Sequence, residues 1–183
     1  MKKICFNSKY FNVKDTLFCG QVFRFRAFKN GYLVISGARA AYLYENPGKT
    51  FIECEDKDCE YFSRYFDLDT DYSKITSLLI KNEEEIIKKA VSLGEGIRIL
   101  NQEVEETLFS FIISQNNNIP RIKSSIEKLS ENFGEKFTFY GQEIFAFPRA
   151  EKLRFPLPIT FVIPKLRWCV LAPDIFGAQS LDQ

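Results

Sequence analysis

Residues 109–122 form an apolar run that three asparagines and a proline interrupt, and they read Phe109-Ser110-Phe111-Ile112-Ile113-Ser114-Gln115-Asn116-Asn117-Asn118-Ile119-Pro120-Arg121-Ile122. Asparagine tolerates left-handed backbone conformations, and its side chain accepts hydrogen bonds from the first free amides of a helix. Proline suits the first helical position. The run therefore predicts a helix over residues 103–115, a short loop, and a second helix that begins at Pro120 and ends before Gly134.

Further helices are expected before this pair, and strands before those. Apolar residues recur at helical spacing from Asp58 onward, and residues 81–93 have the pattern of an amphipathic helix. Upstream, apolar and charged residues alternate over residues 21–28, which is the period of a strand, and turn residues separate further short segments of strand character. The expected strands are residues 21–28, 32–36, 40–44 and 50–53. Strands followed by helices predict an α+β fold, with a small antiparallel sheet over about residues 6–55.

The asparagine loop has a structural and a functional interpretation. In the first, Asn116, Asn117 and Asn118 only end one helix and cap the next. In the second, one amide caps while the others face outward to donate and accept hydrogen bonds. Arg121 favours the second, because an arginine in the first turn of a helix opposes the helix dipole. Its cost is small if the guanidinium meets a phosphate or the edge of a base.

Gly20 is the second candidate position, just before the first expected strand. A glycine at such a place usually serves a backbone turn. The alternative is that the missing side chain lets a ligand approach the backbone carbonyl closely. The local pattern leaves both interpretations open.

Composition narrows the class of protein. With 183 residues, 45% of them hydrophobic, and 19 phenylalanines, the chain is expected to be globular. Its 25 basic and 24 acidic residues give no electrostatic hint of a nucleic-acid partner. The five cysteines match no zinc framework, there is no histidine, and no apolar run approaches the length of a membrane span. We therefore expect free thiols, no metal site, no cofactor and an intracellular protein.

Three blocks together resemble the 8-oxoguanine DNA glycosylase family, in that family's order and spacing. They are Thr16-Leu17-Phe18-Cys19-Gly20-Gln21-Val22-Phe23-Arg24, Gly96-Ile97-Arg98-Ile99-Leu100, and residues 106–122. The likeness runs to about Leu153, and its most specific part is residues 109–122. It implies an N-terminal antiparallel β-sheet domain over residues 1–95, followed by an incomplete α-helical DNA glycosylase domain over residues 96–153.

The resemblance also implies a site and a partner. The family extrudes the damaged base, and the carbonyl matching Gly20 would accept a hydrogen bond from the N7–H that 8-oxoguanine has and guanine lacks. Residues matching Asn116 and Arg121 would bind the orphaned cytosine, with Asn117 as a weaker candidate. The implied partner is double-stranded DNA containing 8-oxoguanine opposite cytosine. It would be bound by a monomer, away from any membrane, in the cytoplasm and at the nucleoid.

The catalytic residues of the family have no match among these blocks. Its lysine, which attacks the sugar C1′, and its assisting aspartate belong to a later, glycine-rich region. Residues 154–183 form an atypical proline-rich tail, in which Lys165, Asp174 and Asp182 lie in no recognisable hairpin. We therefore assign no catalytic residue, expect this chain alone to be inactive, and interpret the tail as a frameshift, a fusion scar or an extended arm. The helices before Leu153 are then expected to expose apolar faces.

Two other functions stay open. A glycosylase for alkylated bases shares the general architecture, although the blocks around Gly20 and Asn116 argue against it. A non-catalytic module that binds DNA or senses lesions is favoured by the missing lysine. The balanced charge argues against that module, because few phosphate contacts give weak binding.

Overall fold

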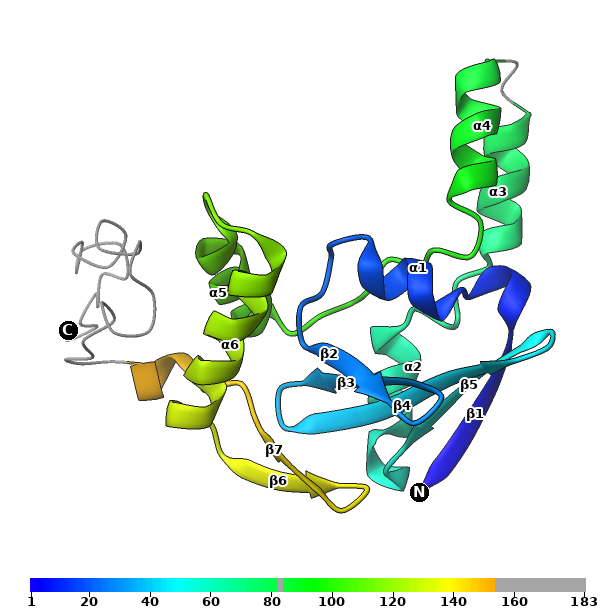
Figure 1. Cartoon of the computed structure of the whole chain (residues 1–183). Coiled ribbons are helices and arrows are strands. Elements are labelled where there is room, and N and C mark those ends of the chain that lie inside the picture. Colours follow the sequence, from blue (N-terminus) through cyan, green and yellow to red (C-terminus); the bar gives the residue numbers. More distant parts are fainter. Residues whose placement is uncertain (82–83, 154–183) are drawn as a thin grey trace, which may run out of the picture.

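The computed structural model describes residues 1–81 and 84–153, and it has the predicted α+β order of strands followed by helices (Figure 1). Five strands form an antiparallel sheet in the order β1-β5-β4-β3-β2. They are β1 Lys2–Asn7, β2 Phe25–Phe28, β3 Gly31–Ser36, β4 Arg39–Asn46 and β5 Lys49–Cys54. The sheet begins earlier than the predicted residue 6, because the short, mostly exposed β1 pairs with β5 along the edge.

Both faces of the sheet are covered, which explains the nearly continuous apolar character of its central strands. On one face, Val34 and Leu43 pack with Phe62 of the helix that follows the sheet. On the other face, Leu33 packs with Phe139 of a second hairpin. This hairpin consists of β6 Lys136–Phe139 and β7 Gln142–Phe145. The sequence pattern does not predict it.

The predicted helices are confirmed, with ends shifted by a few residues. The helices are α1 Val13–Phe18, α2 Cys59–Tyr65, α3 Tyr72–Ile80, α4 Glu85–Leu93, α5 Val104–Ser114 and α6 Ile119–Phe133. Short 3-10 turns are η1 Ser8–Tyr10, η2 Asp56–Asp58 and η3 Ala150–Leu153. Helices α1 and α3 are additions that the pattern does not predict. Gly134 caps the end of α6, and the position requires glycine because a Cβ there would lie 1.9 Å from the Ala146 carbonyl oxygen.

The predicted strand over residues 21–28 is wrong in its first half, since β2 begins only at Phe25. The Gln21 side chain explains why. Its amide nitrogen donates to the carbonyls of Thr16 and Arg98, and its amide oxygen accepts from the backbone of Leu100. These bonds hold the segment before β2 in a loop. Arg24, one of the charged residues of that alternating segment, is buried.

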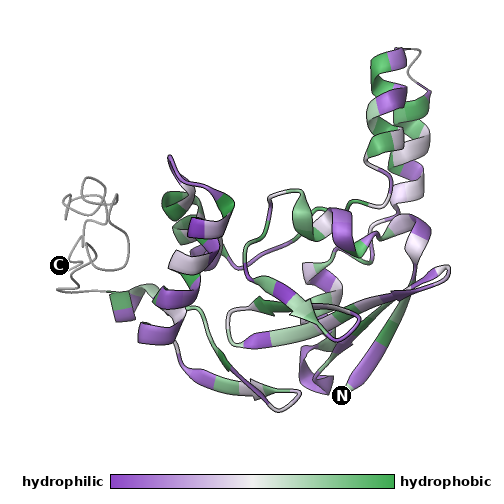
Figure 2. Ribbon diagram, viewed as in Figure 1, coloured by the Kyte–Doolittle hydropathy of each residue, from purple (hydrophilic) through white to green (hydrophobic). Residues whose placement is uncertain are grey.

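Helices α5 and α6 enclose a second core. Ile113, Ile122, Ile126, Leu129 and Phe147 form it. The outer face of α5 carries the exposed apolar residues Val104, Leu108 and Phe111. The α3–α4 pair, which stands away from the sheet in Figure 1, also shows hydrophobic residues on its surface (Figure 2). The expectation of exposed apolar helix faces before Leu153 is therefore confirmed.

The domain boundary between residues 95 and 96 stays a prediction. Leu100, just after it, packs in the core of the sheet, and Arg98 is fully buried. The predicted tail over residues 154–183, with Lys165, Asp174 and Asp182, lies outside the described residues. The four cysteines within the described residues are free thiols. None of the helices in residues 1–81 and 84–153 combines the length and apolar character that crossing a membrane requires.

Candidate functional site

The three asparagines between α5 and α6 have three different environments. Asn118 is the N-cap of α6, and its side-chain oxygen accepts a hydrogen bond of 3.1 Å from the Arg121 amide. Asn117 donates to the Ile113 carbonyl at 3.2 Å and accepts from the Asn118 amide at 3.0 Å. Asn116 has a left-handed backbone with φ of 49°, and its exposed side chain bonds to no described residue. Only Asn116 therefore keeps its whole side-chain amide free for a partner.

Arg121 lies in the first turn of α6 and faces away from the core. Its neighbour Ile122 is buried, whereas Arg121 is exposed and its guanidinium forms no ion pair or hydrogen bond within residues 1–81 and 84–153. The positive end of the helix dipole makes this a poor place for an unpaired cation. A phosphate or the acceptor edge of a base would remove that penalty. Asn116 and Arg121 thus present free polar groups from the two sides of one loop.

Gly20 occupies the loop between α1 and β2 with a φ of 95°. A Cβ built at this position would meet nothing within 4 Å, so crowding inside the chain does not explain the glycine. The left-handed backbone does. Gly20 is also exposed, which leaves room for a ligand beside its carbonyl.

Replacing Gly20 with alanine is expected to cost about 1 kcal/mol of folding free energy, because alanine disfavours a positive φ. Gly48 in the β4–β5 turn is a matched control, since its φ is 78° and its Cβ would also meet nothing within 4 Å. Urea denaturation of both variants should show similar losses. An unchanged midpoint for Gly20→Ala alone would show that the glycine conformation is not constrained.

Contacts between α6 and the loop after α1 bring the candidate residues to one region. The Lys123 ammonium of α6 lies 3.4 Å from the ring centroid of Phe25 and 5.8 Å from that of Phe18. Phe23, in the same loop as Gly20, packs against the core between α5 and α6. The Gly20 loop therefore adjoins the helix that carries Arg121.

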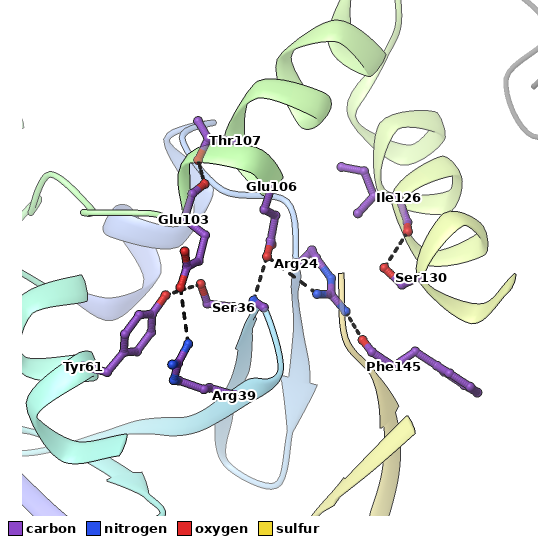
Figure 3. Close-up of polar contacts among 11 residues, drawn as sticks. Arg24, Ser36, Arg39, Tyr61, Glu103, Glu106, Thr107, Ile126, Ser130 and Phe145 are labelled. Atoms are coloured by element: carbon purple, nitrogen blue, oxygen red, sulfur yellow. Dashed lines mark hydrogen bonds and ion pairs between the residues drawn. The ribbon is translucent and has the colours of Figure 1, made fainter. Parts of the chain in front are cut away.

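A buried ion pair joins Arg24, just before β2, to Glu106 of α5 (Figure 3). Arg24 Nη1 and Glu106 Oε2 are 3.8 Å apart, within the range of an ion pair but beyond that of a hydrogen bond. Arg24 also donates to the Phe145 carbonyl, and Glu106 accepts from the Gly37 amide at 2.8 Å. Burial raises the pKa of Glu106, an effect that the Arg24 charge opposes, and burial lowers the pKa of Arg24. The pair joins the sheet to α5.

A cleft of about 740 Å³ opens between the sheet and the second core. Its polar lining is largely paired internally: Arg39 bonds to Glu103 and Asp58, and Lys152 bonds to Glu135. None of Gly20, Asn116, Asn117 and Arg121 lines it. The predicted site residues lie on an exposed surface rather than in this cleft.

Sequence patterns miss three residues of the junction. Gln21 and Lys123 have ordinary polar positions in the sequence, and only their contacts reveal a role. Arg24 belongs to the same block as Gly20, but the alternating pattern does not reveal that it is buried. Spacing alone does not show which charged side chains are buried.

Comparison with known proteins identifies relatives. A family model described as 8-oxoguanine DNA glycosylase, N-terminal domain, matches residues 3–108. The N-glycosylase/DNA lyase of Saccharomyces cerevisiae is 36% identical over 105 residues, which are 55% of this chain and 27% of that protein. The residues that the family model matches include the Gly20 loop and the buried Arg98.

Solved structures extend the likeness through the second core. The apo form of Clostridium acetobutylicum 8-oxoguanine glycosylase/lyase is 36% identical with a TM-score of 0.77, over 88% of this chain and 57% of that one. The same enzyme with double-stranded DNA containing cytosine opposite 8-oxoG is 37% identical with a TM-score of 0.75, over 84% and 53%. A 3-methyladenine DNA glycosylase from Archaeoglobus fulgidus, at 16% identity and a TM-score of 0.58, shares the fold alone. The chain thus spans little more than half of the clostridial relative.

Proposed function

Because this chain belongs to the 8-oxoguanine DNA glycosylase family, we propose that it binds duplex DNA and recognises 8-oxoguanine opposite cytosine as part of base-excision repair. The observation that carries the proposal is the α5–α6 loop. Asn118 caps α6, while Asn116 and Arg121 hold polar groups that no described residue satisfies. These are the side chains that the resemblance assigns to the orphaned cytosine.

Gly20 distinguishes the lesion from guanine. The carbonyl oxygen of this exposed residue accepts a hydrogen bond from the N7–H of an extruded 8-oxoguanine. Guanine has an acceptor at N7, which the carbonyl oxygen repels. One hydrogen bond of this kind discriminates by about 1–3 kcal/mol. The open space where a Cβ would stand supports a close approach of the base.

Asn116 and Arg121 recognise the cytosine left behind. A guanidinium donates to the O2 and N3 acceptors of cytosine, and a free amide adds a donor and an acceptor. Asn117 is the weaker candidate, since its side chain bonds within the loop through both its nitrogen and its oxygen. One copy of the chain carries both the Gly20 loop and the α5–α6 loop, so it acts as a monomer. It acts at the nucleoid, where the duplex DNA lies.

The test measures binding of the full chain to duplexes with 8-oxoguanine opposite cytosine, 8-oxoguanine opposite adenine, and guanine opposite cytosine. Arg121→Gln is expected to weaken binding to 8-oxoguanine opposite cytosine about tenfold, because one base contact is worth about 1–3 kcal/mol. The variant should then no longer prefer cytosine over adenine opposite the lesion. Asn116→Gly removes the amide without straining the left-handed backbone, and a smaller loss is expected.

Arg64→Gln is the matched control. Arg64 is an exposed arginine of α2 whose ion pair with Glu60 is open to solvent, so its removal should leave the preference unchanged. Equal affinity of the unaltered chain for all three duplexes would refute lesion recognition. Preference for a duplex with an alkylated base would favour the alternative glycosylase.

A further inference from the structure

Lys123 is a half-buried cation for which residues 1–81 and 84–153 supply no counter-ion. Its ammonium sits over the ring of Phe25 at 3.4 Å from the centroid, and burial lowers its pKa. It forms no ion pair or hydrogen bond with any residue in the described part of the chain, and no carboxylate contributes to the change in its pKa.

The other described lysines that stack on aromatic rings differ from Lys123 in this respect. Lys3 lies 3.8 Å from a Glu53 oxygen, Lys9 lies 3.9 Å from Glu95, and Lys136 lies 2.8 Å from Glu143. Lys29 is close enough to Glu53 to help lower the pKa of that carboxyl. Three of these four cations are thus paired with a carboxylate, and the fourth, Lys29, lies near one. The π face of a ring attracts a cation by only about 0.5–2 kcal/mol, and it accepts no conventional hydrogen bond.

The position of Lys123 connects the two proposed recognition elements. It follows Arg121 by two residues on α6, and it also lies 5.8 Å from the ring of Phe18, two residues before Gly20. Phe18 is 55% exposed, although its ring makes T-shaped contacts with Phe25 and Tyr32. Lys123 thus lies on the helix that carries Arg121 and against two aromatic residues that flank the Gly20 loop.

We infer that Lys123 binds a backbone phosphate of the DNA at the junction between the Gly20 loop and α6. The inference rests on the proposed function, since it assumes that duplex DNA lies on this surface. A phosphate supplies the missing counter-ion and accepts hydrogen bonds from the ammonium. As a contact with the backbone, it positions the duplex and adds no discrimination between bases.

The experiment is a salt titration of binding by the full chain to duplexes with 8-oxoguanine or guanine opposite cytosine. Removing one phosphate contact is expected to make the plot of the logarithm of the association constant against the logarithm of the salt concentration shallower, by about 0.9 in slope. The change should be equal for both duplexes. Lys123→Gln and Lys123→Met should both show this change, and Lys123→Arg should keep the original slope. Methionine retains an apolar stem over Phe25, so it reports on charge even if glutamine disturbs the packing.

Lys49→Gln is the matched control for loss of one charge. Lys49 is exposed at the start of β5 and has no ion pair within the described residues, so the slope measured for Lys49→Gln should equal that of the unaltered chain. Binding by the unaltered chain with no change of slope in either Lys123 variant would overturn this inference and leave the proposed function standing. Failure of the unaltered chain to bind either duplex would overturn both.

Discussion

Replacing Arg98 with leucine is expected to unfold most of the chain at room temperature. The guanidinium is fully buried and donates from Nε to the Phe66 carbonyl at 2.9 Å, and from Nη1 to the Tyr10 carbonyl at 2.9 Å. Nη2 donates to the carbonyls of Asp67 and Thr70. A charged donor contributes about 1.5–3 kcal/mol per hydrogen bond, and the buried Phe66 carbonyl costs about 1–3 kcal/mol more when it loses its donor. The loss approaches the whole stability of a typical domain, about 5–15 kcal/mol.

Urea denaturation and circular dichroism measure this effect. Arg98→Lys should recover little, because a single ammonium cannot reach carbonyls that the planar guanidinium contacts from three nitrogens. Arg64→Leu, on the exposed face of α2, should stay within about 0.5 kcal/mol of the unaltered chain. A folded Arg98→Leu protein with an unchanged midpoint would contradict the view that Arg98 holds η1, α2 and the segment before α3 together.

Arg98 also shows where sequence patterns stop being informative. Hydrophobic periodicity predicts the sheet and four of the helices, since buried apolar residues such as Leu43 and Ile126 recur at the required spacing. A charged residue in such a pattern is assigned to the surface. Arg98 and Arg24 are instead buried, and each donates a hydrogen bond to a carbonyl remote in the sequence. Arg98 donates to Tyr10, and Arg24 donates to Phe145. Periodicity carries no information about such partners.

The sequence likewise predicts some features of the candidate site and not others. The asparagine and proline composition of the loop predicts a cap, and Asn118 is that cap. Three identical side chains in sequence cannot reveal which one caps, which one bonds backward to α5 and which one stays free. The left-handed backbone of Asn116 makes that selection. Helix periodicity is sufficient for Arg121, because burial of Ile122 fixes the outward direction of its neighbour.

Arg24→Met is expected to cost about 3 kcal/mol at pH 8, because it leaves the Glu106 carboxylate buried without its cation. Replacing both members, as in Arg24→Met with Glu106→Gln, should cost less than the sum of the two single changes by about 1–3 kcal/mol. The glutamine side-chain oxygen still accepts from the Gly37 amide, as the carboxylate does at 2.8 Å. Urea denaturation of the four proteins gives the coupling energy directly.

The pH dependence of the Arg24→Met variant gives this coupling a second readout. Burial already raises the pKa of Glu106, and loss of the opposing Arg24 charge raises it further. A raised folded-state pKa means that the folded chain binds the proton more tightly than the unfolded chain does. Protonation of Glu106 therefore stabilises the fold below the ordinary glutamate pKa, and this stabilisation disappears as pH rises through the raised pKa. Arg24→Met should therefore lose less stability at pH 5 than at pH 8. Adding Glu106→Gln should remove that difference, and a variant equally destabilised at both pH values would show that Glu106 does not depend on Arg24.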